Sequence, residues 1–188
     1  MNMDKHLYIA HGYTANSKKH WFKWLTEQVD DIDSKILDFP NSSNPVLEDW
    51  NKTLLDEVDI TSGNNVIVAH SLGVVTVLDY LSRFEGEWNV KGLVLVAGFY
   101  EKIPNLNKID TYMDQTQVDF EKIIKQVPNI VSVIASNDRL VPRNLSERLA
   151  EKLQSEEVIV EHEGHFCDSD GYTEFPEVAE IVNDMFNK

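Results

Sequence analysis

Short apolar runs alternate with longer amphipathic stretches along most of the chain. The short runs are rich in Val, Ile and Leu, which is typical of strands, whereas the longer stretches place apolar residues three or four positions apart, as helices do. The predicted strands are Leu7–Ala10, Lys35–Phe39, Val66–Ala69, Gly92–Ala97, Ile130–Ala135 and Val158–Val160. The predicted helices are Lys18–Val29, Val46–Val58, Leu72–Arg83, Phe120–Gln126, Pro142–Leu153 and Glu177–Phe186.

Several predicted strands are apolar throughout, which indicates a sheet that is covered on both faces. V-I-V-A at Val66–Ala69 and L-V-L-V-A at Leu93–Ala97 have no polar side. Their alternation with helices predicts a mostly parallel, six-stranded, doubly wound α/β sheet with helices on both faces, in a single domain over residues 1–188. In such a sheet ligands bind beyond the carboxyl ends of the strands, so functional residues should follow the strands directly.

Polar and small residues stand directly after four of the predicted strands. These segments are His11–Tyr13, His70–Ser71, Ser136–Pro142 and His162–Phe166. Together they supply a serine, an aspartate and histidines in the chain order of the α/β-hydrolase triad, which is Ser, Asp, His. The serine also precedes a predicted helix, as the nucleophile of that triad does.

Ala69–Gly73 reads A-H-S-L-G and differs by one methyl group from the G-x-S-x-G nucleophile elbow. The elbow requires small residues two positions before and two positions after the serine, and Ala69 and Gly73 are both small. We therefore predict that Ser71 is a nucleophile. The alternative is that Ser71 only caps the helix that follows, since serine is favoured at that position.

A serine hydroxyl needs a neighbouring imidazole to take its proton, and a carboxylate orients that imidazole. His165 is the predicted base and Asp138 the predicted carboxylate, although Asp138 could instead be a turn residue. His162 competes with His165 as the base, but it falls at the end of V-I-V-E, where its side chain can still belong to the sheet. The backbone N–H groups of Tyr13 and Leu72 are the predicted oxyanion donors.

A substrate pocket is expected around these groups. The residues predicted to line it are His11, Gly12, His20, Trp21 and Tyr100, with Ile103, Leu106 and Tyr112 as further apolar candidates. His11 could instead shape the oxyanion loop through hydrogen bonds. The loop Glu101–Val118 takes the place of a cap, and its length should let it shade the pocket without enclosing it. An open pocket favours small or accessible esters and thioesters.

Acidic residues outnumber basic ones, with 32 Asp and Glu against 17 Lys and Arg and a formal net charge of −15. Without a basic surplus, the chain is not expected to bind nucleic acid or anionic membranes. No apolar run reaches the roughly 18 residues that a membrane span needs, and the N-terminus lacks the pattern of a signal peptide. With Cys167 as its one cysteine, the chain is predicted to be cytoplasmic, as a monomer or a homodimer.

Signatures of metal and cofactor binding are missing from the sequence. H-E-x-x-H, paired cysteines and G-x-G-x-x-G do not occur, so no metal or cofactor is expected. Cys167 lies close to His165, but it follows the predicted base and has no turn that would form an oxyanion hole. It is therefore not expected to be a nucleophile.

The motifs H-G-Y, H-W-F, L-E-D-W, A-H-S-L-G, N-D-x-x-V-P and G-H-F follow one another from residue 11 to residue 166. In this order they resemble the small serine hydrolases of the YdeN and retinoblastoma-binding-protein-9 type over nearly the whole chain. The resemblance implies a minimal α/β-hydrolase with little or no lid, with Ser71, Asp138 and His165 as its triad. It also implies hydrolysis of ester-type bonds through an acyl-enzyme. A protein that keeps this fold for binding or scaffolding, with little catalysis, is the alternative.

Overall fold

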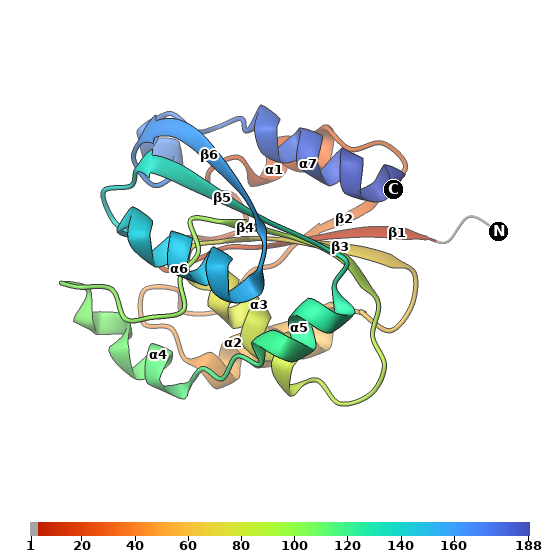
Figure 1. The fold of residues 1–188 in the computed structure, drawn as a ribbon, viewed down its shortest axis with the longest axis horizontal. Helices are drawn as coiled ribbons and strands as arrows, with labels where there is room; N and C mark the ends of the chain where they lie inside the picture. Colours follow the sequence, from red (N-terminus) through yellow and green to blue (C-terminus); the bar gives the residue numbers. More distant parts are fainter. Residues whose placement is uncertain (1–3) are drawn as a thin grey trace.

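The computed structural model describes residues 4–188 and contains one six-stranded sheet flanked by helices (Figure 1). The strands are β1 (Lys5–Ala10), β2 (Asp33–Ile36), β3 (Asn64–His70), β4 (Val90–Val96), β5 (Asn129–Asn137) and β6 (Glu156–Glu163). The helices are α1 (Phe22–Glu27), α2 (Leu47–Glu57), α3 (Leu72–Arg83), α4 (Asp110–Gln115), α5 (Phe120–Gln126), α6 (Arg143–Leu153) and α7 (Pro176–Asn187). Two short 3-10 turns, η1 (Asn107–Ile109) and η2 (Asp168–Asp170), complete the set.

The strand order across the sheet is β2-β1-β3-β4-β5-β6, and every neighbouring pair is parallel. The predicted parallel, doubly wound sheet is therefore confirmed. The chain builds outward from β1 to β2 in one direction and from β3 to β6 in the other, so the strand order reverses between β1 and β3. Ligands of open α/β sheets bind at such a switch point, and the segments after β1 and β3 lie there.

Helices cover both faces of the sheet, with α1 and α7 on one face and α2, α3, α5 and α6 on the other (Figure 1). Successive residues of a strand point to opposite faces. In β3, Val66 and Val68 therefore pack with side chains of α1 and α7, whereas Ile67 and Ala69 pack with side chains of α2 and α3. This two-sided burial explains why the V-I-V-A run contains no polar residue.

The first helix is shorter than its periodicity predicts. α1 begins at Phe22, whereas the pattern predicted a helix over Lys18–Val29. His20 has a φ of 57°, in the left-handed region that a right-handed helix does not contain. Residues 17–21 consequently form turns and a bend, and Trp24 within α1 is only half-buried.

Other predicted segments differ from the structure in detail. Leu55 is 66% exposed, because α2 packs through Leu47, Trp50 and Leu54. The segment that was predicted as a loop, residues 101–118, contains η1 and α4. Among residues 4–188, no helix combines the length and the apolar character needed to cross a membrane.

Candidate active site

Ser71 lies on the sharp turn between β3 and α3. Its backbone has φ 58° and ψ −123°, a conformation that is uncommon and costly for a residue with a side chain. A Cβ on Gly73 would collide with the carbonyl oxygens of Ala10 and His11, so the turn needs glycine at this position. Ala69 is fully buried in the core with its methyl group accommodated, so alanine is sufficient on the other side of the serine.

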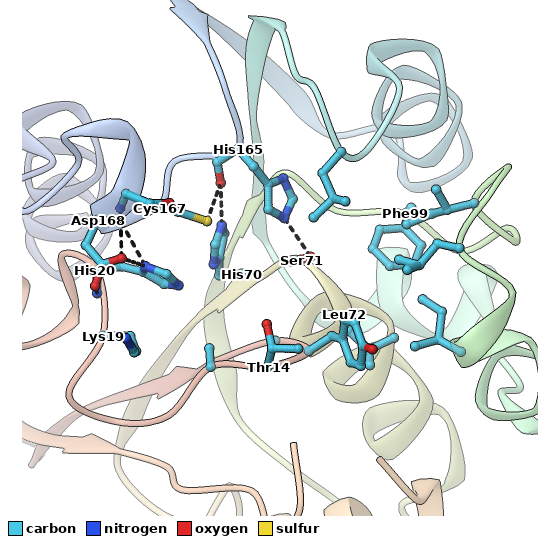
Figure 2. A pocket seen from close by; sticks show the side chains of 18 residues that line it. Thr14, Lys19, His20, His70, Ser71, Leu72, Phe99, His165, Cys167 and Asp168 are labelled. Carbon is cyan, nitrogen blue, oxygen red and sulfur yellow. Dashed lines mark hydrogen bonds and ion pairs between the residues drawn. The ribbon is translucent and has the colours of Figure 1, made fainter. Parts of the chain in front are cut away.

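Ser71 faces a histidine from the segment that follows β6. The Ser71 Oγ and His165 Nε2 are 2.8 Å apart (Figure 2), and His165 Nδ1 donates to Asp138 Oδ2 at 2.7 Å. The other carboxylate oxygen, Asp138 Oδ1, accepts hydrogen bonds from the backbone N–H groups of Leu140 and Val141, both at 2.8 Å. Segments that follow β3, β5 and β6 thus bring together a hydroxyl, an imidazole and a carboxylate in one hydrogen-bonded line.

The competing histidine, His162, lies within β6 and makes no hydrogen bond to Ser71. Its ring stacks on Phe166, with ring centroids 5.0 Å apart, and also packs on Tyr172. The structure therefore brings His165, and not His162, to the serine. His162 is still part of β6, whereas Gly164, with φ 152°, lies between the two histidines after the strand has ended and turns the chain before His165.

The loop after β1 approaches the elbow closely. A Cβ on Gly12 would lie 2.9 Å from the carbonyl oxygen of His70 and 3.2 Å from the amide nitrogen of Leu72, so only glycine permits this approach. Within residues 4–188, the N–H groups of Tyr13 and Leu72 donate to no protein acceptor. Leu72 is the first residue of α3, where an N–H has no partner inside the helix. Both predicted oxyanion donors are therefore free to bind a ligand.

His11 lies behind this loop. Its Nε2 accepts a hydrogen bond from the N–H of Phe39 at 2.9 Å, so the proton of the neutral ring is on Nδ1, which donates to the carbonyl oxygen of Gly12, also at 2.9 Å. Burial lowers the pKa of His11, which keeps the ring neutral. His11 does not line the cavity, and its contacts correspond to the alternative that it shapes the loop.

A cavity of about 430 Å³ lies over Ser71. Its polar side is formed by Lys19, His20, Cys167, Asp168 and Ser169. Its apolar side is formed by Phe99, Ile103, Leu106, Ile109 and Leu140. Figure 2 shows Ser71 between the two sides, with Lys19, His20 and Asp168 on one side and Phe99 on the other. The remaining lining residues are Gly12, Tyr13, Thr14, Ala15, His70, Ser71, Leu72 and His165.

Gly12 and His20 line the cavity as predicted, but the prediction is corrected for Trp21 and Tyr100 as it is for His11. Trp21 is fully buried, and its Nε1 donates to the carbonyl oxygen of Phe166 at 3.0 Å. Tyr100 packs on the ring of Phe120 instead.

The sequence reasoning missed several lining residues. Phe99 lies one residue before Tyr100, which was predicted to line the pocket in its place. Tyr112, which was also expected on the wall, is buried against Thr76. Lys19, Asp168 and Ser169 carry no motif of their own. Only the fold, which brings the segment before α1 beside η2, reveals their place in the cavity wall.

Burial shifts the ionisation of two further groups at the cavity. His70 is buried and its Nε2 donates to the carbonyl oxygen of His165 at 2.8 Å, while burial holds the pKa of His70 well below its usual value. Burial also raises the pKa of the Cys167 thiol to about 12, so the nucleophilic thiolate does not form at neutral pH. Within residues 4–188, no group of three or more His, Cys, Asp or Glu side chains could hold a metal ion.

A buried parallel sheet with a serine on a strained strand-to-helix turn is the arrangement of the α/β-hydrolase fold. The family model described as serine hydrolase matches residues 7–184. The chain belongs to this family, as its motifs had indicated.

Two proteins of similar sequence support this family assignment. YdeN of Bacillus subtilis (strain 168) is 35% identical over 188 residues, which cover 99% of this chain and 98% of YdeN. The serine hydrolase RBBP9 of Rattus norvegicus is 21% identical over 168 residues, or 88% of this chain and 86% of RBBP9.

Solved structures share the fold. The crystal structure of the ydeN gene product from B. subtilis matches with a TM-score of 0.91 and 34% identity, covering 98% of this chain and 100% of that chain. Est1E from Butyrivibrio proteoclasticus matches with a TM-score of 0.72 and 16% identity, covering 100% of this chain and 90% of its own. The chain is a hydrolase with an α/β-hydrolase fold.

Proposed function

We propose that this hydrolase cleaves a carboxylic ester-type bond of a small molecule, with Ser71 as nucleophile, His165 as base and Asp138 as the residue that orients the base. The observation that carries the proposal is the line of hydrogen bonds from Ser71 to His165 at 2.8 Å and from His165 to Asp138 at 2.7 Å. The strained backbone of Ser71 supports it further, because such strain is retained where function requires it.

The reaction begins when Ser71 Oγ attacks the substrate carbonyl carbon and His165 Nε2 takes the hydroxyl proton. Asp138 stabilises the resulting imidazolium. The carbonyl oxygen becomes an oxyanion and accepts hydrogen bonds from the N–H groups of Tyr13 and Leu72. Each such donor is worth about 3–4 kcal/mol in the transition state, as judged from removal of a comparable donor in another hydrolase.

The tetrahedral intermediate collapses when His165 returns the proton to the leaving oxygen, so that the alcohol departs and the acyl group remains on Ser71. Water then attacks the acyl-enzyme, with His165 taking its proton, and the acid leaves when the proton passes back to Ser71 Oγ. Every group that moves a proton or stabilises charge in these steps belongs to the chain, so the reaction as proposed uses no cofactor.

The size of the cavity limits the substrate. A volume of about 430 Å³ falls in the lower part of the range that small-molecule sites occupy. η1 and α4 contribute one wall and do not form a separate lid domain. The substrates favoured by this proposal are esters or thioesters with short acyl chains.

Labelling with a fluorophosphonate probe tests the nucleophile. Wild type should be labelled at one site, and Ser71→Ala should not be labelled although its thermal unfolding is unchanged. Hydrolysis of p-nitrophenyl acetate and butyrate should exceed that of longer p-nitrophenyl esters. A folded wild type that neither reacts with the probe nor hydrolyses these esters would overturn the proposal and favour a binding protein.

A further inference from the structure

His20 presents a fixed hydrogen-bond donor on the polar side of the cavity. Its Nδ1 accepts a hydrogen bond from the backbone N–H of Asp168 at 2.9 Å. A backbone N–H can only donate, so Nδ1 carries no proton and the proton of the neutral ring is on Nε2. Burial lowers the pKa of His20, which favours this neutral form.

The Nε2–H of His20 has no partner among residues 4–188, although the side chain is only 10% exposed. His20 lines the cavity, and Figure 2 shows its ring reaching away from Asp168, with the second ring nitrogen at the far end. A neutral donor that is open to the cavity, on a side chain that is otherwise mostly buried, gains a partner when a ligand supplies an acceptor.

Neighbouring rings hold the imidazole in place. His20 packs edge-on against His70 at a centroid distance of 5.3 Å and against Phe22 at 5.4 Å. His70 is in turn hydrogen-bonded to the carbonyl oxygen of His165. The donor is thus positioned by the same framework that positions the proposed base.

The backbone of His20 is costly to maintain. Its φ of 57° lies in the left-handed region and interrupts the helix predicted from Lys18, so that α1 begins only at Phe22. Strained residues cluster at sites where their exact placement is used. Ser71, the proposed nucleophile, and Phe166, which directly follows the proposed base, also have a positive φ.

We propose that His20 determines substrate specificity by donating a hydrogen bond from Nε2 to an oxygen on one arm of the substrate, while the other arm is apolar and packs on Phe99 and Ile103. The substrate class is therefore a small amphipathic ester that carries an acceptor oxygen on one side of the scissile bond. This inference rests on the proposed function, because the scissile ester must lie at Ser71 between the two sides of the cavity.

Three esters of equal length test the inference. Butyl pentanoate has two alkyl arms, 2-methoxyethyl pentanoate replaces one methylene of the alcohol arm by oxygen, and butyl 3-methoxypropanoate does the same in the acyl arm. The ratio of kcat/KM for each ether ester to that for butyl pentanoate is measured in wild type and in His20→Phe. The intrinsic effect of the ether oxygen on reactivity is the same for both proteins and cancels.

For one of the two ether esters, the ratio in wild type should exceed the ratio in His20→Phe by about 3- to 10-fold, the range of one neutral hydrogen bond. His6→Phe is the matched control. His6 lies near the start of β1, whereas the cavity lies at the carboxyl ends of the strands, so this substitution should leave both ratios unchanged. Should His20→Phe fail to fold, His20→Asn replaces it, since asparagine tolerates a left-handed backbone and cannot place a donor at the Nε2 position.

Equal ratios in wild type and the His20 variant for both ether esters would overturn the inference. The proposed function stands separately, because it requires only that wild type is labelled at Ser71 and hydrolyses p-nitrophenyl acetate or butyrate. Loss of both labelling and hydrolysis in wild type would overturn the two together.

Discussion

The imidazole of His70 donates a hydrogen bond from Nε2 to the carbonyl oxygen of His165 at 2.8 Å. The residue immediately before the serine therefore holds the segment that carries the proposed base. The two rings lie 4.9 Å apart, and His70 is buried. The distance between nucleophile and base is consequently set by the ends of β3 and β6, and not by the side chains of Ser71 and His165 alone.

Removal of the hydrogen bond from His70 should let His165, the proposed base, move relative to Ser71. His70→Phe removes the imidazole donor from the carbonyl oxygen of His165 and leaves it only the weak Sγ–H donor of Cys167 at 3.7 Å, which should lower the free energy of unfolding by about 1–3 kcal/mol. A shift of His165 by about 1 Å would lower kcat roughly 100-fold. His70→Gln can place its side-chain amide near the position of Nε2 and should retain more activity than His70→Phe. Equal kcat values for the two variants would contradict this account.

Asp138→Asn should abolish most activity through the tautomer of His165. The N–H groups of Leu140 and Val141 both donate to Oδ1, so the new amide must keep its oxygen there and turn its NH₂ group toward His165 Nδ1. His165 would then carry its proton on Nε2 and could not accept one from Ser71. We expect kcat to fall roughly 10⁴-fold, as in a related triad.

The control for Asp138→Asn is Asp49→Asn in the exposed first turn of α2, which should leave kcat unchanged. Circular dichroism should show both variants folded. A fall in kcat of less than about tenfold for Asp138→Asn would contradict the proposed role of the carboxylate.

Gly12→Ala should damage the proposed oxyanion site. The added Cβ would lie 2.9 Å from the carbonyl oxygen of His70 and 3.2 Å from Leu72 N, so the loop with Tyr13 must move away. Displacement of one donor should lower kcat roughly 100-fold and change KM little. Gly86→Ala, where nothing lies within 4 Å of the added Cβ, is the comparison for a loop glycine and should alter only stability. A KM effect without a kcat effect would point to substrate binding instead.

Stability should decrease when the pH falls from about 7.5 to 5.5. Burial lowers the pKa values of His11, His20 and His70 in the folded protein, whereas the same histidines titrate near 6.5 when unfolded. Below that pH the unfolded chain binds more protons than the folded chain, so protonation favours unfolding. Urea titrations at a series of pH values measure the effect, and His70→Gln should make the dependence shallower. A free energy of unfolding that stays constant or rises over this interval would contradict the prediction.

The sequence predicted the main features of the fold because they depend on local pattern. Buried strands and amphipathic helices each leave a periodic signal, and the right-handed crossover rule converts their alternation into a parallel sheet. The positions that follow strands could then be searched for chemistry. Ser71, Asp138 and His165 were selected in this way, and the structure brings their side chains into one line of hydrogen bonds.

The walls of the cavity could not be predicted in the same way. Trp21 and Tyr100 were chosen for their position along the chain, but a side chain's direction depends on backbone dihedrals that hydrophobic periodicity does not report. The left-handed residue at His20 is an example, because α1 begins only after it, at Phe22, and its ring lines the cavity. Its contact with Asp168, which lies 148 residues away, exists only in the folded chain.

Cys167 is the one cysteine of the chain, and it lines the cavity beside His165. Because burial raises the pKa of its thiol to about 12, Cys167 is protonated at pH 7. Peroxides and alkylating agents attack the ionised form, so they should react very slowly at this position. Reagents that modify cysteine should therefore leave hydrolysis by this chain unchanged, although a thiol lines its cavity.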